Sequence, residues 1–208
     1  RVLTERFESA SKLEKLLNIV GGESMQGLTR KSNKDISSHF NMHVKEFAKL
    51  SKAQRKTYQR RFELDKYLSD TRVESHPIPY IYEYKNISQF KIDKYDGYIN
   101  IRSINNDNFQ RSRDKNIFEG KKVLITRVGT ILKAVYTPYD IVFSLNIFGV
   151  KLKDEHLSYL VASLFNSYLI NYIVDIRYKK RVYDNMPRID GNVIKGIPIP
   201  QNLDEELV

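Results

Sequence analysis

The sequence predicts an α+β protein, because helical and strand patterns occupy separate parts of the chain. Residues 30–72 are densely charged and favour helices, whereas alternating apolar residues and turn signals begin at His76. A single apolar stripe with helical spacing returns between Leu157 and Ile173. Helices and strands that are segregated along a chain are typical of the α+β class.

The charge of the chain points to an anionic partner. The 208 residues carry a net charge of +10 and give a pI of about 9.5. A field of this sign favours a polyanion, and nucleic acid is the commonest one. Excess lysine that only keeps the fold soluble is the alternative interpretation. An acidic membrane surface also fits the charge, but no predicted helix combines a basic face with a broad apolar one.

Composition excludes several other classes. The mean hydropathy is −0.50, and no apolar run reaches the ~18 residues that a spanning helix needs. The chain has no cysteine, which rules out a disulfide framework and fits a reducing cytoplasm. The first residues, RVLTERFES, contain neither an initiator Met nor a signal-peptide pattern. We therefore expect a fragment of a longer cytoplasmic protein.

Three regions are predicted: residues 1–29, a basic helical insert at 30–75, and a recognition domain at 76–208. Ser11 with Glu14 forms a capping pattern for a short helix that would end before Gly21. Ser51 with Gln54 forms another, for a helix running to about Leu68. Residues 30–72 hold twelve basic and five acidic side chains, a net charge of +7. Such a block is either a solvated helix surface or a clamp along a phosphate backbone.

The recognition domain is predicted to contain strands and one long helix. Strands are expected at 78–84, 98–104 and 123–128, followed by a further strand over 133–145. Between Leu157 and Ile173 the apolar residues keep helical spacing for four turns. This helix should pack its apolar stripe against the sheet.

Catalytic motifs are mostly missing. The chain has no Gly-rich cofactor turn and no Asn/Asp-Pro-Pro-Tyr/Phe tetrapeptide, so methyl transfer by this chain alone is not expected. Asp114, Glu119 and Lys121 resemble the acid…Glu-x-Lys pattern of metal-dependent nucleases, although Gly120 sits in an apparent turn. His39 and His43 have the i, i+4 spacing of zinc ligands, but no third ligand is evident. We therefore expect no metal site.

Loops between the predicted strands hold side chains suited to reading DNA. Arg pairs with guanine and Asn or Gln with adenine, each bidentate pair giving ~1–3 kcal/mol of discrimination. An Asn-rich turn whose side chains bond their own backbone is the alternative interpretation of residues 99–115. Lys and Arg after the long helix suit phosphate oxygens, or alternatively the helix dipole. The candidate DNA-binding residues are Arg30, Lys31, Arg102, Asn105, Gln110, Arg111, Arg113, Arg127, Arg177, Lys179, Lys180 and Arg181.

Four phrases occur in an order that resembles a known family. They are FEGKKVLITR, LKAVYTPYDIVFSLN, YLVASLFNSYLINYI and PRIDGNVIKGIPIPQ. Together they resemble the TaqI-like C-terminal specificity domain of restriction–modification enzymes and, more loosely, the specificity subunits of type I systems. The resemblance covers roughly His76 to Gln201, and the insert at 30–72 is not part of it. It also offers an extended strand as the alternative for LLNIVGG.

The resemblance implies a curved, mostly antiparallel sheet with packed helices, to which the basic helical insert is added. It implies double-stranded DNA as the partner and a catalytic methyltransferase domain, in the same chain or in a partner subunit, that would bind S-adenosylmethionine. The parent protein would be an adenine-specific methyltransferase, a type II restriction enzyme or both, used by a prokaryote in phage defence. A metal-dependent endonuclease and a basic protein-interaction module are the rival functions.

Overall fold

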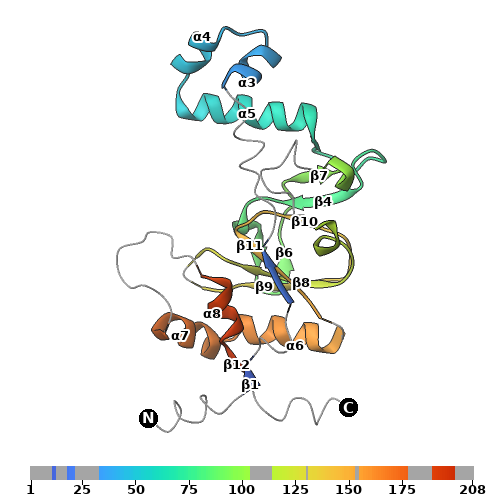
Figure 1. The fold of residues 1–208 in the computed structure, drawn as a ribbon, viewed down its shortest axis with the longest axis vertical. Coiled ribbons are helices and arrows are strands. Elements are labelled where there is room, and N and C mark those ends of the chain that lie inside the picture. The colour runs from blue at the N-terminus through green and yellow to red at the C-terminus, as the bar shows by residue number, and fades with distance from the viewer. Residues whose placement is uncertain are drawn as a thin grey trace.

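The molecule is built as a stack of helices and sheets (Figure 1). The computed structural model describes residues 11–12, 18–21, 33–103, 114–129, 131–152, 155–177 and 189–199. A block of three helices lies at one end, followed by a small sheet, a second sheet, and then the C-terminal helices. The predicted α+β class is confirmed.

The helical block consists of α3 (Asn33–His39), α4 (Val44–Lys49) and α5 (Lys52–Lys66). The predicted capping box opens α5: Ser51 N donates to Gln54 Oε1 (2.9 Å), and Gln54 N donates to Ser51 Oγ (3.2 Å). His43 caps α4 by accepting from the backbone of Lys45 (3.2 Å). His39 instead ends α3 and stacks edge-on to Phe62 (5.1 Å). The two histidines thus belong to separate turns.

The first sheet has the strand order β10-β4-β7-β3. Its members are β3 (Leu68–Ser69), β4 (Ile78–Ile81), β7 (Gly97–Ile99) and β10 (Val142–Phe143). β4 is antiparallel to β7 and parallel to β10, while β3 is antiparallel to β7. β3 lies inside the range predicted for the insert, so the boundary at residue 75 cuts through this sheet.

The second sheet has the order β2-β11-β8-β9, and all its pairs are antiparallel. It consists of β2 (Asn18–Gly21), β8 (Lys122–Thr126), β9 (Ala134–Thr137) and β11 (Ile147–Lys151). Residues 18–21 are therefore extended, which favours the strand interpretation of LLNIVGG over the helix. Pairing of β2 with β11 also joins the N-terminal region to the recognition domain. The one curved sheet that was expected is divided between two sheets.

Short elements connect these sheets. β1 (Ser11–Lys12) pairs with β12 (Pro198–Ile199), and β5 (Ile87–Ser88) pairs with β6 (Lys91–Ile92). The 3-10 turns are η2 (Tyr84–Asn86), η3 (Ile101–Ser103) and η4 (Lys115–Ile117). Gly120, with φ 64°, forms the tight turn between η4 and β8.

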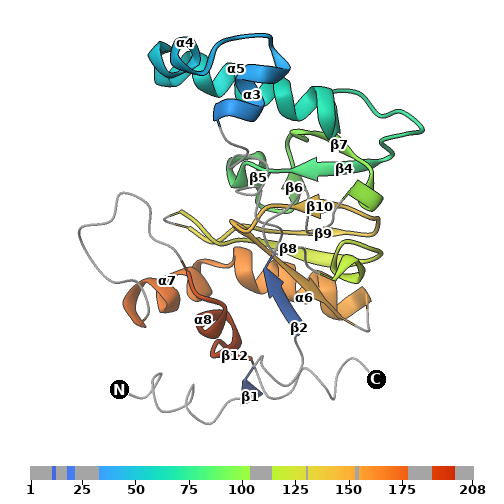
Figure 2. The same ribbon diagram turned by 45° about the horizontal axis from the view of Figure 1, so that its top comes forward.

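The C-terminal helices are α6 (Glu155–Asn166), α7 (Tyr168–Arg177) and α8 (Gly191–Lys195), which lie below the second sheet in Figure 2. The long helix predicted over Leu157–Ile173 is thus two helices that bend by 58° at Ser167. Similarly, the strand predicted over 133–145 divides into β9 and β10, which belong to different sheets.

Two hydrophobic cores meet at the second sheet. Leu124, Val135 and Ile147 face the first core, which also holds Phe47 and Phe62 from the helical block. Val123 and Ile125 face the second core, together with buried residues of α6, α7 and α8. β8 is therefore buried on both faces, and the helical block shares its core with the strands. Within the described residues no single helix has the length and apolarity to cross a membrane, although the bent pair α6–α7 passes such a test when taken together.

Candidate DNA-binding interface

A chain of hydrogen bonds links the two sheets and runs partly through buried residues, Ser144 and Ile189. Ser144 Oγ donates to the carbonyl of Tyr82 (2.7 Å), and the neighbouring carbonyl of Leu145 accepts from Arg127 Nη1 (3.4 Å). The carbonyl of Arg127 in turn accepts from the backbone N–H of Ile189 (2.9 Å). We call this line of five residues, Tyr82, Ser144, Leu145, Arg127 and Ile189, the Arg127 edge.

Among the predicted DNA-binding residues, Arg127 is the one whose side-chain contacts the structure describes in most detail. Its Nε donates to the carbonyl of Ile189 (3.3 Å), and its guanidinium lies 5.3 Å from the centre of the Phe148 ring. The side chain is only half-buried, and a guanidinium has five N–H donors. Arg127 thus connects three loops, and its hydrogen bonds to the described residues use two of its five donors.

Arg102 lies at the opposite end of the sheets. β4 ends beside Tyr82, and β7 runs antiparallel to it, so the η3 turn that follows β7 is at the far end. The backbone N–H of Arg102 there donates to Asn100 Oδ1 (2.9 Å), while its side chain is exposed. The structure therefore does not bring Arg102 and Arg127 together.

The remaining candidates fall largely outside the described residues. These are Arg30, Lys31, Asn105, Gln110, Arg111, Arg113, Lys179, Lys180 and Arg181, while only the backbone of Arg177 is described. The structure describes the residues on either side of the two predicted clusters but not the clusters themselves. The segment 104–113 leaves η3 and returns at Asp114, at the far end. The segment 178–188 leaves α7 and returns at Ile189, on the Arg127 edge.

The residues of the nuclease hypothesis have other partners. Asp114 caps η4 by accepting from Asn116 N (3.0 Å), and Lys121 forms an ion pair with Glu155 of α6. Glu119 is exposed in the turn before β8. In the part of the chain that the structure describes, no three His, Asp or Glu side chains come together as a metal site.

Lys122 is a buried cation that the sequence pattern did not single out. Its ammonium donates to the carbonyls of Phe118 (2.9 Å), Tyr139 (3.0 Å) and Gly120. Burial, reinforced by the charge of Lys151, lowers its pKa to about 8, against the opposing influence of Asp140 and Glu119. Lys122 thereby fastens the start of β8 to the β9–β10 connection, which is a structural role.

The Asn-Ser pair in YLVASLFNSYLINYI also has a structural role. The side-chain amide of Asn166 accepts from the N–H of Ala134 and donates to its carbonyl, both at 2.8 Å. Ser167 Oγ accepts from the N–H of Ile170 (3.2 Å) and so caps α7. Asn171 Oδ1 accepts from the N–H of Leu132 (2.6 Å). The bend between α6 and α7 thus places two amides against the edge of β9.

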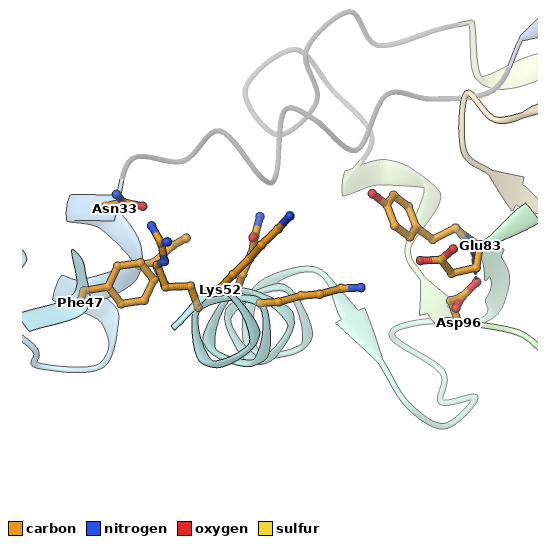
Figure 3. A pocket seen from close by; sticks show the side chains of 10 residues that line it. Asn33, Phe47, Lys52, Glu83 and Asp96 are labelled. Carbon is orange, nitrogen blue, oxygen red and sulfur yellow. Dashed lines mark hydrogen bonds between the residues drawn. The ribbon is translucent and has the colours of Figure 1, made fainter. Parts of the chain in front are cut away.

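A hollow of about 700 Å³ separates the helical block from the first sheet (Figure 3). Lys52, Arg55, Lys56 and Gln59 of α5 line one wall. These residues have i, i+3, i+4, i+7 spacing and so share one helix face. Spacing alone would have found this face, but not what lies opposite to it.

The opposite wall of the hollow contains Tyr82, Glu83 and Asp96. Asp96 Oδ2 accepts from the backbone N–H groups of Tyr82 (2.7 Å) and Glu83 (3.0 Å), which ties the end of β4 to the start of β7. Tyr82 therefore belongs both to the lining of the hollow and to the Arg127 edge.

An α+β domain with a net charge of +10 and a helix face that carries Lys52, Arg55 and Lys56 belongs to the class of proteins suited to bind nucleic acid. Comparison with known families is more specific. Residues 80–199 match the TaqI-like C-terminal specificity domain, which covers more than half of the chain. The chain therefore belongs to this family of DNA-specificity domains from restriction–modification enzymes. A comparison with characterised proteins gave no match. Helices α3–α5 lie outside the matched range.

Proposed function

We propose that the chain selects the DNA target of an adenine-specific methyltransferase in a restriction–modification or phage-defence system and performs no chemistry itself. The observation that carries this proposal is the family match over residues 80–199. The net charge of +10 supports it, because a basic protein attracts the phosphate backbone. S-adenosylmethionine would be bound by a separate catalytic domain, in the same polypeptide or in a partner subunit, within the prokaryotic cytoplasm.

The predicted residues divide into two roles under this proposal. Arg111 and Arg113 would contact base edges, because arginine pairs with guanine in the major groove. Lys179 and Lys180 would contact phosphates, which set affinity and register without reading sequence. Since the two roles make different demands on DNA sequence, they are tested with separate variants.

Binding of the purified chain to a pool of randomised duplexes tests this proposal. The chain should enrich one sequence, and its affinity should fall steeply as salt rises. Arg111→Ala with Arg113→Ala should relax the enriched sequence, whereas Lys179→Ala with Lys180→Ala should weaken binding to all duplexes alike. Absence of duplex binding at low salt would refute the proposal. Magnesium-dependent cleavage that Glu119→Ala abolishes would instead support the nuclease hypothesis.

A further inference from the structure

The cationic face of α5 has few partners within the protein. Neither Lys52 nor Lys56 pairs with a carboxylate among the described residues, and both side chains are exposed. The Nε–H group of Arg55 is buried and, within the described part of the chain, has no hydrogen-bond partner. A buried donor without a partner destabilises the folded state by about 1–3 kcal/mol, so an oxyanion entering the hollow would relieve that cost.

The same helix packs into the core along a strip next to its hollow-lining face. Phe62 is buried in the first core, and Tyr58 packs edge-on to Phe47 with ring centres 6.1 Å apart. The direction of the hollow-lining face is therefore fixed by the core beside it, since rotation of α5 would expose these rings. A rigid helix that carries three cations within one turn, a rise of about 6 Å, matches the spacing of successive phosphates better than a flexible charged tail does.

The cationic face of α5 lies across the hollow from Tyr82, which belongs to the Arg127 edge. Tyr82 lines the wall opposite α5, and its carbonyl is bonded to Ser144 on the Arg127 edge. Tyr82 is exposed, so a duplex in contact with it would lie next to the hollow. Figure 3 shows Lys52 on one side of this mouth and Glu83 with Asp96 on the other.

We infer that helix α5 is a second DNA-binding arm, which grips the phosphate backbone of the duplex through Lys52, Arg55 and Lys56. This inference rests on the proposed function, because it concerns the same DNA molecule. It assigns a role to the helical block, which lies outside the family match. Phosphate contacts raise affinity for every sequence, so the arm adds binding strength and leaves target choice to the recognition domain.

The carboxylates opposite α5 determine which side of the hollow the backbone follows. Asp96 is held by the N–H groups of Tyr82 and Glu83. Glu83 is half-buried, and its side chain makes no cap hydrogen bond to the turn that it precedes. Its negative charge would repel a phosphate that approached the sheet wall. Removing that charge should therefore strengthen DNA binding, which is a result that a merely structural residue would not give.

The test compares two double variants that remove the same charge from the helical block. Lys52→Ala with Lys56→Ala removes the hollow-lining cations, while Lys45→Ala with Lys49→Ala removes two exposed lysines of α4 that do not line the hollow. Affinity for a duplex is measured against salt concentration. The first variant should lower the slope of log K against log salt by about 2 and weaken binding on the order of tenfold, with the enriched sequence unchanged. The second should change the slope little.

A third variant, Glu83→Gln, completes the test. It should raise the affinity for the duplex severalfold without altering the thermal unfolding midpoint of the protein. Equal effects of the two lysine pairs, or no effect of either, would overturn the inference while leaving the proposed function intact, provided that the unaltered chain binds the duplex. If the unaltered chain binds no duplex, the proposed function and the inference both fail. Circular dichroism of every variant checks that a loss of binding is not a loss of folding.

Discussion

Replacing Asn166 by Ala should destabilise the protein more than replacement of any exposed asparagine. The variant loses two hydrogen bonds of 2.8 Å to Ala134, each worth about 1 kcal/mol. The Ala134 carbonyl keeps the N–H of Phe90 as a donor (2.9 Å), but its own buried N–H is left unpaired. Together these losses come to about 3 kcal/mol, which for a chain of this size lowers Tm by about 6–12 °C.

Thermal unfolding followed by circular dichroism measures this effect, with Asn192→Ala on the exposed side of α8 as the control. Asn166→Asp adds a sharper test, because the new carboxylate would face the Ala134 carbonyl oxygen. Its pKa should rise, so the folded state binds the additional proton and this variant should gain stability as pH falls. If Asn166→Ala unfolds within about 2 °C of the unaltered protein, the amide does not anchor β9 and the reasoning is wrong.

Three further outcomes are expected in the same unfolding assay. Lys122→Met should lower stability by about 2–4 kcal/mol because the three hydrogen bonds of its ammonium are lost, although the Phe118 carbonyl keeps the N–H of Ile141 (2.9 Å) as a donor. Lys121→Met loses only a surface ion pair and should scarcely differ from the unaltered chain. The pKa of Lys122 is lowered from 10.5 to about 8 in the folded protein. Between these pH values the unfolded chain binds more protons than the folded one, so Lys122 makes the stability rise with pH from about 8 to 10. This rise should be missing from Lys122→Met. Gly149→Ala should destabilise by about 1–3 kcal/mol because its methyl group overlaps the buried ring of Phe143, whereas Gly191→Ala, with its nearest neighbour at 3.7 Å, should be tolerated; equal effects would contradict the packing argument.

Local patterns in the sequence predicted several elements correctly. The Ser51–Gln54 capping box and the start of α5 were predicted because a cap depends on residues only three positions apart. Strand β8 was predicted from the apolar run after Gly120. The family was recognised from four phrases in a fixed order, which needs no knowledge of their contacts.

Contacts between distant residues required the tertiary structure. The bend at Ser167 depends on the pairing of Asn166 with Ala134, which is 32 residues away in the chain. Apolar periodicity alone therefore predicted one continuous helix over Leu157–Ile173, where the fold has α6 and α7. Likewise, β9 and β10 belong to different sheets although they are only four residues apart.

The sequence by itself determined that the protein is a basic α+β domain of the TaqI-like specificity family, because charge, periodicity and motif order are properties of the chain. Only the tertiary structure decided which distant residues lie close together. Arg127 and the α5 face are far apart in sequence, yet both border Tyr82 or its bonded neighbours. Hydrogen bonds from the side chains of Ser144 and Arg127 to backbone carbonyls of other loops bring them there, and no local pattern encodes such bonds.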